Sequence, residues 1–216
     1  MEYNTQGKVL KKAVVRQELY FYRKSDVIYQ LTQVFCRRFL PLHGDRTVDQ
    51  MVQAARSCKQ NIVEGCEDGQ TSSEMEIKLV NVARGSLQEL RQDYLDYLKS
   101  HGLGVWDSKH PRFDGMLEYC RSHNDWADYQ KLSETLPDED FCNMALTLCH
   151  ITDKMISSYL KGLEQRFVTE GGIKERMHAA RTGYREEVDR RLRQLEEENT
   201  KLKAENQELK KRLGML

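Results

Sequence analysis

The 216-residue sequence has few residues that interrupt helices and no long hydrophobic run. Proline occurs at three positions, 41, 111 and 137, so long stretches lack the residue that disrupts helix interiors. No apolar run approaches the roughly 18 residues of a membrane span, and no signal-peptide pattern is present, which predicts a cytoplasmic protein without a membrane segment. The six cysteines form no CxxC pair, and small apolar thiols in a reducing compartment explain them better than disulfides do.

The chain also has no net charge at neutral pH. The 34 basic residues balance 34 acidic ones, so no global field attracts polyanions. The distribution is uneven, because residues 1–60 hold 11 Lys/Arg against 5 Asp/Glu, whereas residues 61–173 hold 11 against 20. A basic front and an acidic middle can attract a mixed partner or a second copy of the chain. The alternative interpretation is that these charges solvate helix faces.

The sequence does contain apolar residues at steps of three and four, the spacing of one face of a helix. This pattern predicts long helices over residues 25–40, 47–65 and 73–100 and from Asp138 to Gly171, and shorter ones near Phe113–Cys120 and Trp126–Leu136. No strand-like alternation accompanies them.

Two capping boxes predict where helices begin. Thr47 with Gln50, and Ser73 with Glu76, have the spacing in which each side chain satisfies the other residue's backbone amide. Gly65 is predicted to end the helix that Thr47 begins, because glycine is common just past helix ends.

Four long amphipathic helices cannot bury their apolar stripes alone. We therefore expect an all-α fold, an antiparallel up-and-down four-helix bundle over residues 25–172, preceded by a basic extension over residues 1–24. Residues 173–216 are predicted to form a separate helical tail.

The tail has the heptad pattern of a leucine-zipper-like coiled coil. The d positions are Val188, Leu195, Leu202, Leu209 and Leu216, and the a positions are Leu192, Asn199, Asn206 and Leu213. Asparagine at a satisfies its amide against an asparagine across the seam, which fixes the register and favours a parallel dimer. We therefore expect the tail to be an oligomerising device. The alternative is a solvated single helix, or one that docks on the body.

The sequence offers little for catalysis. No glycine-rich phosphate loop and no Cys/His cluster with metal spacing occurs. His150 and Asp153, one helical turn apart, are the best candidates, because a carboxylate can orient an imidazole. A satisfied core or interface histidine is the alternative for His150. We expect a non-enzymatic protein with no metal or cofactor site.

Basic residues are the candidate nucleic-acid-binding site: Lys11, Lys12, Arg37, Arg38, Arg56 and Lys59. Such a stripe, repeated by oligomerisation, binds phosphate backbones through counterion release. Arg37 and Arg38 are equally explained by the preference of cations for the carbonyl end of a helix.

Residues 47–57 (TVDQMVQAARS) and 60–65 (QNIVEG) resemble the bacterial four helix bundle proteins, which include proteins encoded within intervening sequences of large-subunit ribosomal RNA genes. The likeness continues over residues 71–74 and 76–87. Residues 167–177 (FVTEGGIKERM) resemble the variant with a distinct C-terminal suffix segment. The resemblance covers about residues 25–177, and the heptad segment lies outside it.

The resemblance implies an antiparallel four-helix protomer that can assemble into a ring of five. A similar fold serves as the accessory variability determinant of diversity-generating retroelements, which binds nucleic acid and a reverse transcriptase. The expected function is therefore a non-enzymatic, oligomeric accessory protein that binds structured RNA, a reverse transcriptase, or both. The alternative is a protein–protein interaction hub that uses the coiled-coil tail without binding nucleic acid.

Overall fold

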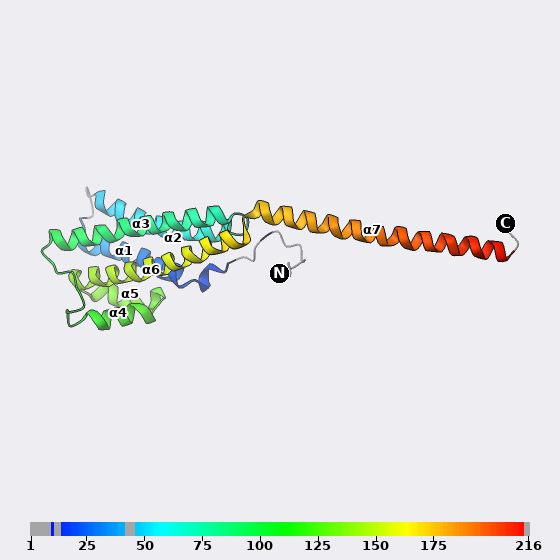
Figure 1. Ribbon diagram of the computed structural model, residues 1–216. Coiled ribbons are helices and arrows are strands. Elements are labelled where there is room, and N and C mark those ends of the chain that lie inside the picture. Colours follow the sequence, from blue (N-terminus) through cyan, green and yellow to red (C-terminus); the bar gives the residue numbers. More distant parts are fainter. Residues whose placement is uncertain (1–9, 11–13, 42–45, 214–216) are drawn as a thin grey trace. The chain divides into compact units, whose positions relative to one another are not determined.

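The computed structural model describes residues 10, 14–41 and 46–213, and every regular element in these ranges is helical (Figure 1). In chain order they are the 3-10 helix η1 (Arg16–Glu18) and the α-helices α1 (Tyr20–Phe39), α2 (Arg46–Asp68), α3 (Ser73–Ser100), α4 (Phe113–Ser122), α5 (Trp126–Thr135), α6 (Asp138–Glu170) and α7 (Ile173–Arg212). The predicted all-α class is confirmed. None of these helices is long and apolar enough to cross a membrane. They divide into two units, α1–α6 and α7.

The first helix begins earlier than its periodicity predicted. α1 starts at Tyr20, so residues 20–24, assigned above to the basic extension, belong to the helix. Its N-cap residue, Leu19, makes no side-chain hydrogen bond to the helix, so the sequence carries no capping signal there. Phe21 and Lys24 of this first segment are buried.

The two predicted helix starts are each one residue or less from the observed ones. α2 begins at Arg46, one residue before the predicted cap Thr47. Ser72, the residue before the predicted cap Ser73, caps α3, and its hydroxyl accepts a 3.2 Å hydrogen bond from the amide of Met75. Adjacent serines offer the same side chain, and spacing alone does not distinguish them.

Gly65 does not end α2, which continues to Asp68. A Cβ at Gly65 would lie 3.1 Å from Cγ2 of Val80, so this glycine allows α3 to pack closely against α2. By contrast, Gly171 follows α6 with φ of 70°, the left-handed conformation that glycine adopts readily, and ends that helix as predicted.

Four helices surround the core of the first unit. α2 packs on α3, α3 packs on α6, and α1 packs on both α2 and α6. In the pairs that involve α1 or α6, early residues of one helix meet late residues of the other, and the serines that join α2 and α3 lie near the middle of both helices. The pairs are Asp26–Lys59, Ser57–Ser86, Glu76–Tyr159, Arg84–Asp153, Phe21–Tyr159 and Phe35–Phe141. The short helices α4 and α5 cover α6 and α1 respectively.

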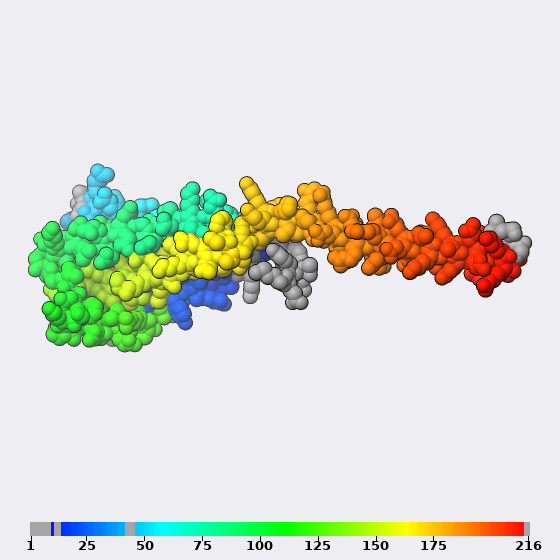
Figure 2. Space-filling view, in the orientation of Figure 1, coloured from blue at the N-terminus to red at the C-terminus, as the bar shows by residue number. Residues whose placement is uncertain are grey.

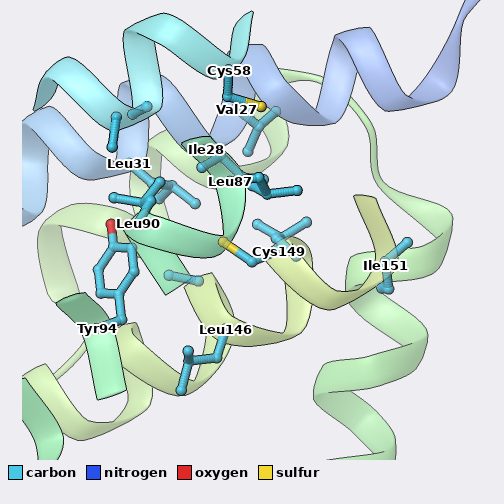
Figure 3. Close-up of a cluster of buried hydrophobic side chains, with 14 of the residues drawn as sticks. Val27, Ile28, Leu31, Cys58, Leu87, Leu90, Tyr94, Leu146, Cys149 and Ile151 are labelled. Carbon is cyan, nitrogen blue, oxygen red and sulfur yellow. The ribbon is translucent and has the colours of Figure 1, made fainter. Parts of the chain in front are cut away.

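The core is formed by inward-facing apolar side chains from several helices (Figure 3). Leu31 of α1 and Leu87 of α3 have no exposed surface, and burying a leucine contributes about 1.5–3 kcal/mol. The hydroxyls of Thr32 and Tyr94 lie 3.0 Å apart and hydrogen-bond across the core. Tyr94 can therefore be fully buried without leaving its hydroxyl unpaired.

All six cysteines are buried and free of disulfides, in agreement with their interpretation as apolar thiols. Burial raises the pKa of Cys58 to about 12 and that of Cys66 to about 11. Both thiols are therefore protonated near neutral pH and are poor nucleophiles.

Lys24 is a buried cation with no exposed surface. Its Nζ donates to the backbone oxygen of Cys120 and, at 3.0 Å, to that of His123. These oxygens lie at the carboxyl end of α4, where carbonyl groups lack helical partners and favour positive charge. Burial lowers the pKa of Lys24. This lysine therefore fixes α4 against α1.

Candidate functional site

The a/d seam of α7, defined by residues 188, 192, 195, 199, 202, 206, 209 and 213, exposes six large apolar side chains. No residue of α7 is buried. The large apolar side chains of the seam are exposed by 44% at Val188 to 72% at Leu213. The intervening leucines, 192, 195, 202 and 209, are exposed by between 46% and 55%.

The local sequence keeps α7 helical along the whole seam. The amide of Gly172 donates a 2.9 Å hydrogen bond to the carboxylate of Glu175, which satisfies a backbone group at the start of the helix. Lys210, Lys211 and Arg212 occupy its last turn, where cations favour the helix dipole. The C-terminal half of α7, orange to red in Figure 2, is a single uninterrupted helix.

Asn199 and Asn206 are exposed and lie on the same stripe as the leucines. In an a/d pattern these amides face another helix, so an incoming partner has to satisfy them. The seam thus combines exposed leucines with two exposed amides.

Two of the predicted nucleic-acid-binding arginines are engaged within the chain. Arg37 forms a 2.5 Å ion pair with Glu134, although its side chain remains 59% exposed. Arg38 donates to the backbone oxygens of Ser133 and, at 2.8 Å, Leu136 at the end of α5. Arg38 therefore holds α5 against α1.

The other two described basic candidates lie on α2. Lys59 forms a 2.6 Å ion pair with Asp26 and lies over the ring of Tyr29. Arg56 is exposed and makes no ion pair or hydrogen bond within the described residues. Lys11 and Lys12 lie outside them. The structure thus directs Arg37 and Arg38 toward α5 and Lys59 toward α1, and the nucleic-acid assignment stays a prediction.

The sequence's catalytic candidates are not paired with each other. Asp153 accepts a 2.8 Å hydrogen bond from Nε of Arg84 instead of orienting His150. His150 is exposed on α6, and partial burial and the nearby Lys154 lower its pKa. The described residues contain no group of three or more His, Cys, Asp or Glu side chains placed to hold a metal ion.

A polar groove of about 880 Å³ lies between α2 and α3, and sequence reasoning did not anticipate it. Its wall includes Arg46, Asp49, Glu89 and Asp93. Burial, followed by the charges of Asp96 and Glu89, raises the pKa of Asp93. Ser57 and Ser86 also line the groove, and their hydroxyls hydrogen-bond to each other at 3.0 Å.

Comparison with protein-family models, with curated proteins and with solved structures finds no match for this chain.

Proposed function

We propose that this chain is a cytoplasmic, non-enzymatic helical scaffold that assembles through the seam of α7. The observation that carries the proposal is the exposure of the seam leucines along a helix with no buried residue. Contiguous exposed apolar surface on a protein is typical of an interaction site.

The composition of α7 supports association. Outside the seam its second half is almost entirely charged or polar. A helix of this kind gains little from its own contacts, whereas packing leucines against another helix every three or four residues removes apolar area from water. Each buried CH₂ group contributes about 0.8 kcal/mol.

The proposal includes an antiparallel, up-and-down four-helix bundle formed by α1, α2, α3 and α6. It is supported by their contacts and by the opposite direction of residue numbering in each neighbouring pair. The resemblance to bacterial four helix bundle proteins adds a ring of five bodies as a separate part of the proposal.

Light scattering coupled to size exclusion tests the function directly. The full chain carrying Leu195→Glu and Leu202→Glu should have a lower mass than the unchanged protein, because charge at d opposes burial of the seam. Gln194→Glu with Lys201→Glu, at outward positions, is the control and should leave the mass unchanged. An equal mass for both variants and the unchanged protein would contradict assembly through α7. A mass of five chains in the seam variant would support the ring.

Binding of structured RNA, or of a reverse transcriptase with its RNA, is the second candidate function. It is favoured by Arg56, which is exposed without a described partner, and by the largely exposed Arg37. Replacing both arginines by glutamate should weaken binding of a structured RNA and reduce its salt dependence. Lys109→Glu with Lys131→Glu, also exposed, makes the same change in net charge elsewhere. Equal binding by the two variants would rule out this site.

A further inference from the structure

We propose that the partner of α7 is the α7 of a second copy of this chain, aligned parallel and in register in a two-stranded coiled coil. This rests on the proposed function, which requires only that the seam pack against some helix. The inference adds the identity, direction and alignment of that helix. The charges that flank the seam carry it.

The a and d positions of the seam fix the flanking g and e positions. The g residues with an e position five residues later in the described helix are Arg191, Glu198 and Glu205, and the matching e residues are Glu196, Lys203 and Lys210. Arg212 is a further g residue and Asp189 a further e residue. In a parallel pair of helices, each g side chain lies beside the e side chain five residues later on the partner, and these pairs set partner choice and orientation.

This rule gives a set of contacts between residues of complementary charge. It pairs Arg191 with Glu196, Glu198 with Lys203, and Glu205 with Lys210 of the second copy. All three pairs join opposite charges, and the twofold symmetry of a dimer forms each of them twice. The charges at the g positions are therefore complementary to the charges at the e positions of the same sequence.

The six flanking side chains are available for these contacts. None of them makes an ion pair within the described part of the chain. The ion pairs that α7 does form, Arg190 with Glu187 and Arg212 with Glu208, use outward positions for three of their four members.

An antiparallel pair of these helices meets two obstacles. With the seams fully overlapped, Asn199 faces Leu202, so its amide is buried without a partner. The g residues then face one another, which brings Arg191 beside Arg212 and Glu198 beside Glu205. These like-charge contacts offset the opposite-charge contacts of the e residues, Glu196 beside Lys203 and Asp189 beside Lys210, so this orientation lacks the net attraction of the parallel pair.

A parallel pair that is shifted by one heptad is also disfavoured. The shift places Arg191 beside Lys203 on one side and Glu198 beside Glu196 on the other. It keeps one asparagine pair, Asn199 with Asn206, but places the other copy's Asn199 against Leu192 and the remaining Asn206 against Leu213. The aligned register alone gives both asparagines an asparagine partner and keeps all g–e pairs opposite in charge.

Disulfide trapping in the full chain tests direction and register. Leu192→Cys, at a, should form an interchain disulfide under mild oxidation, because the two copies of residue 192 meet in an aligned parallel pair. In the antiparallel arrangement the same residues lie about 25 Å apart along the helix axis. Glu197→Cys, at the outward f position, is the control and should not cross-link efficiently. The six native thiols are buried and do not compete.

Charge exchange tests the identity of the partner. One variant reverses g (Arg191→Glu, Glu198→Lys, Glu205→Lys) and a second reverses e (Glu196→Lys, Lys203→Glu, Lys210→Glu). Each alone makes every g–e pair like-charged and should raise the dimer dissociation constant by about a hundredfold. Their mixture restores six opposite-charge pairs and should form a heterodimer as tight as the unchanged dimer. Arg193→Glu with Glu197→Lys and Glu208→Lys has the same net charge as the g variant and should still dimerise.

The outcomes distinguish failure of the proposed function from failure of the parallel, in-register pairing. If the unchanged protein and all variants are monomers, both the proposed function and this inference fail. If the protein assembles through α7, but residue 192 does not cross-link or the two charge variants do not rescue each other, this inference alone fails.

Discussion

The phenol of Tyr159 on α6 donates a 2.6 Å hydrogen bond to the carboxylate of Glu76 on α3. Glu76 is only 3% exposed. The ring of Tyr159 also packs against Phe21 of α1, with centroids 5.0 Å apart. This one side chain therefore joins three helices and pairs a buried charge.

Replacing Tyr159 by phenylalanine should keep the ring contact with Phe21 and remove the donor to Glu76. We expect the free energy of unfolding to fall by about 1.5–3 kcal/mol, the range for a hydrogen bond to a charged group. Urea denaturation followed by circular dichroism measures the change. Tyr184→Phe, at a tyrosine 72% exposed on α7, is the control and should change stability by less than about 0.5 kcal/mol. Equal effects of the two substitutions would contradict the role assigned to Tyr159.

Lys24→Ala should be strongly destabilising although it removes a charged residue. The substitution leaves a cavity where the lysine stem was buried and takes a donor from the end of α4. A loss of about 2–5 kcal/mol is expected, as for truncation of other large buried side chains. Lys131→Ala, at an exposed position of α5, provides the comparison. A Lys24→Ala protein as stable as the Lys131→Ala protein would show that Lys24 is not buried.

Stability should decline in alkali partly through Cys66. Burial, and then the nearby Glu76 carboxylate, raises the pKa of Cys66 from 9.0 to about 11. Because the folded-state pKa is the higher one, the folded chain binds more protons between these values. The stabilising contribution of the thiol is therefore complete below about pH 9 and is lost as pH rises toward 11.

Cys66→Ala removes this contribution at every pH. Under reducing conditions, the difference in unfolding free energy between the unchanged protein and the variant should shrink between about pH 9 and 11, by up to about 1.4 kcal/mol per pH unit. Denaturant titrations at several pH values measure it. A difference that stays constant with pH would mean that the pKa of the thiol is not raised.

Substitutions of Arg38 and Arg56 by alanine should differ in their effect on stability, because Arg38 holds two helices together and Arg56 lies on the surface. Arg38→Ala leaves backbone oxygens at the end of α5 without their donor, and we expect it to lower the unfolding free energy by about 1–3 kcal/mol. Arg56→Ala should change it by less than about 0.5 kcal/mol, because this side chain is exposed and makes no ion pair or hydrogen bond within the described residues. Thermal unfolding of both variants is the measurement, and a reversed order would contradict the packing of α5.

The helices were predictable because apolar residues at three- and four-residue steps follow directly from helix geometry. The short helices near Phe113 and Trp126 and the glycine-terminated end of α6 also follow from local signals, and the structure confirms them. Local signals failed to predict the end of α2, where packing against a neighbouring helix explains the glycine. Gly65 has the local signature of a helix end, but its lack of a side chain serves the contact with α3.

The partners of the charged residues could not be predicted. Arg38 meets the end of α5 more than 90 positions away, at Ser133, and no local pattern encodes such a contact. Lysine is rarely buried, so no sequence pattern places Lys24 in the core. The seam of α7 is different, since its heptad register can be read entirely from sequence.

The most direct test of the account is sedimentation equilibrium of the full chain over a range of micromolar concentrations. A parallel pairing of two α7 helices predicts a species of twice 25.4 kDa, or of ten chains where the bodies also form the ring of five, that dissociates on dilution. A mass of 25.4 kDa at every concentration would contradict assembly through α7.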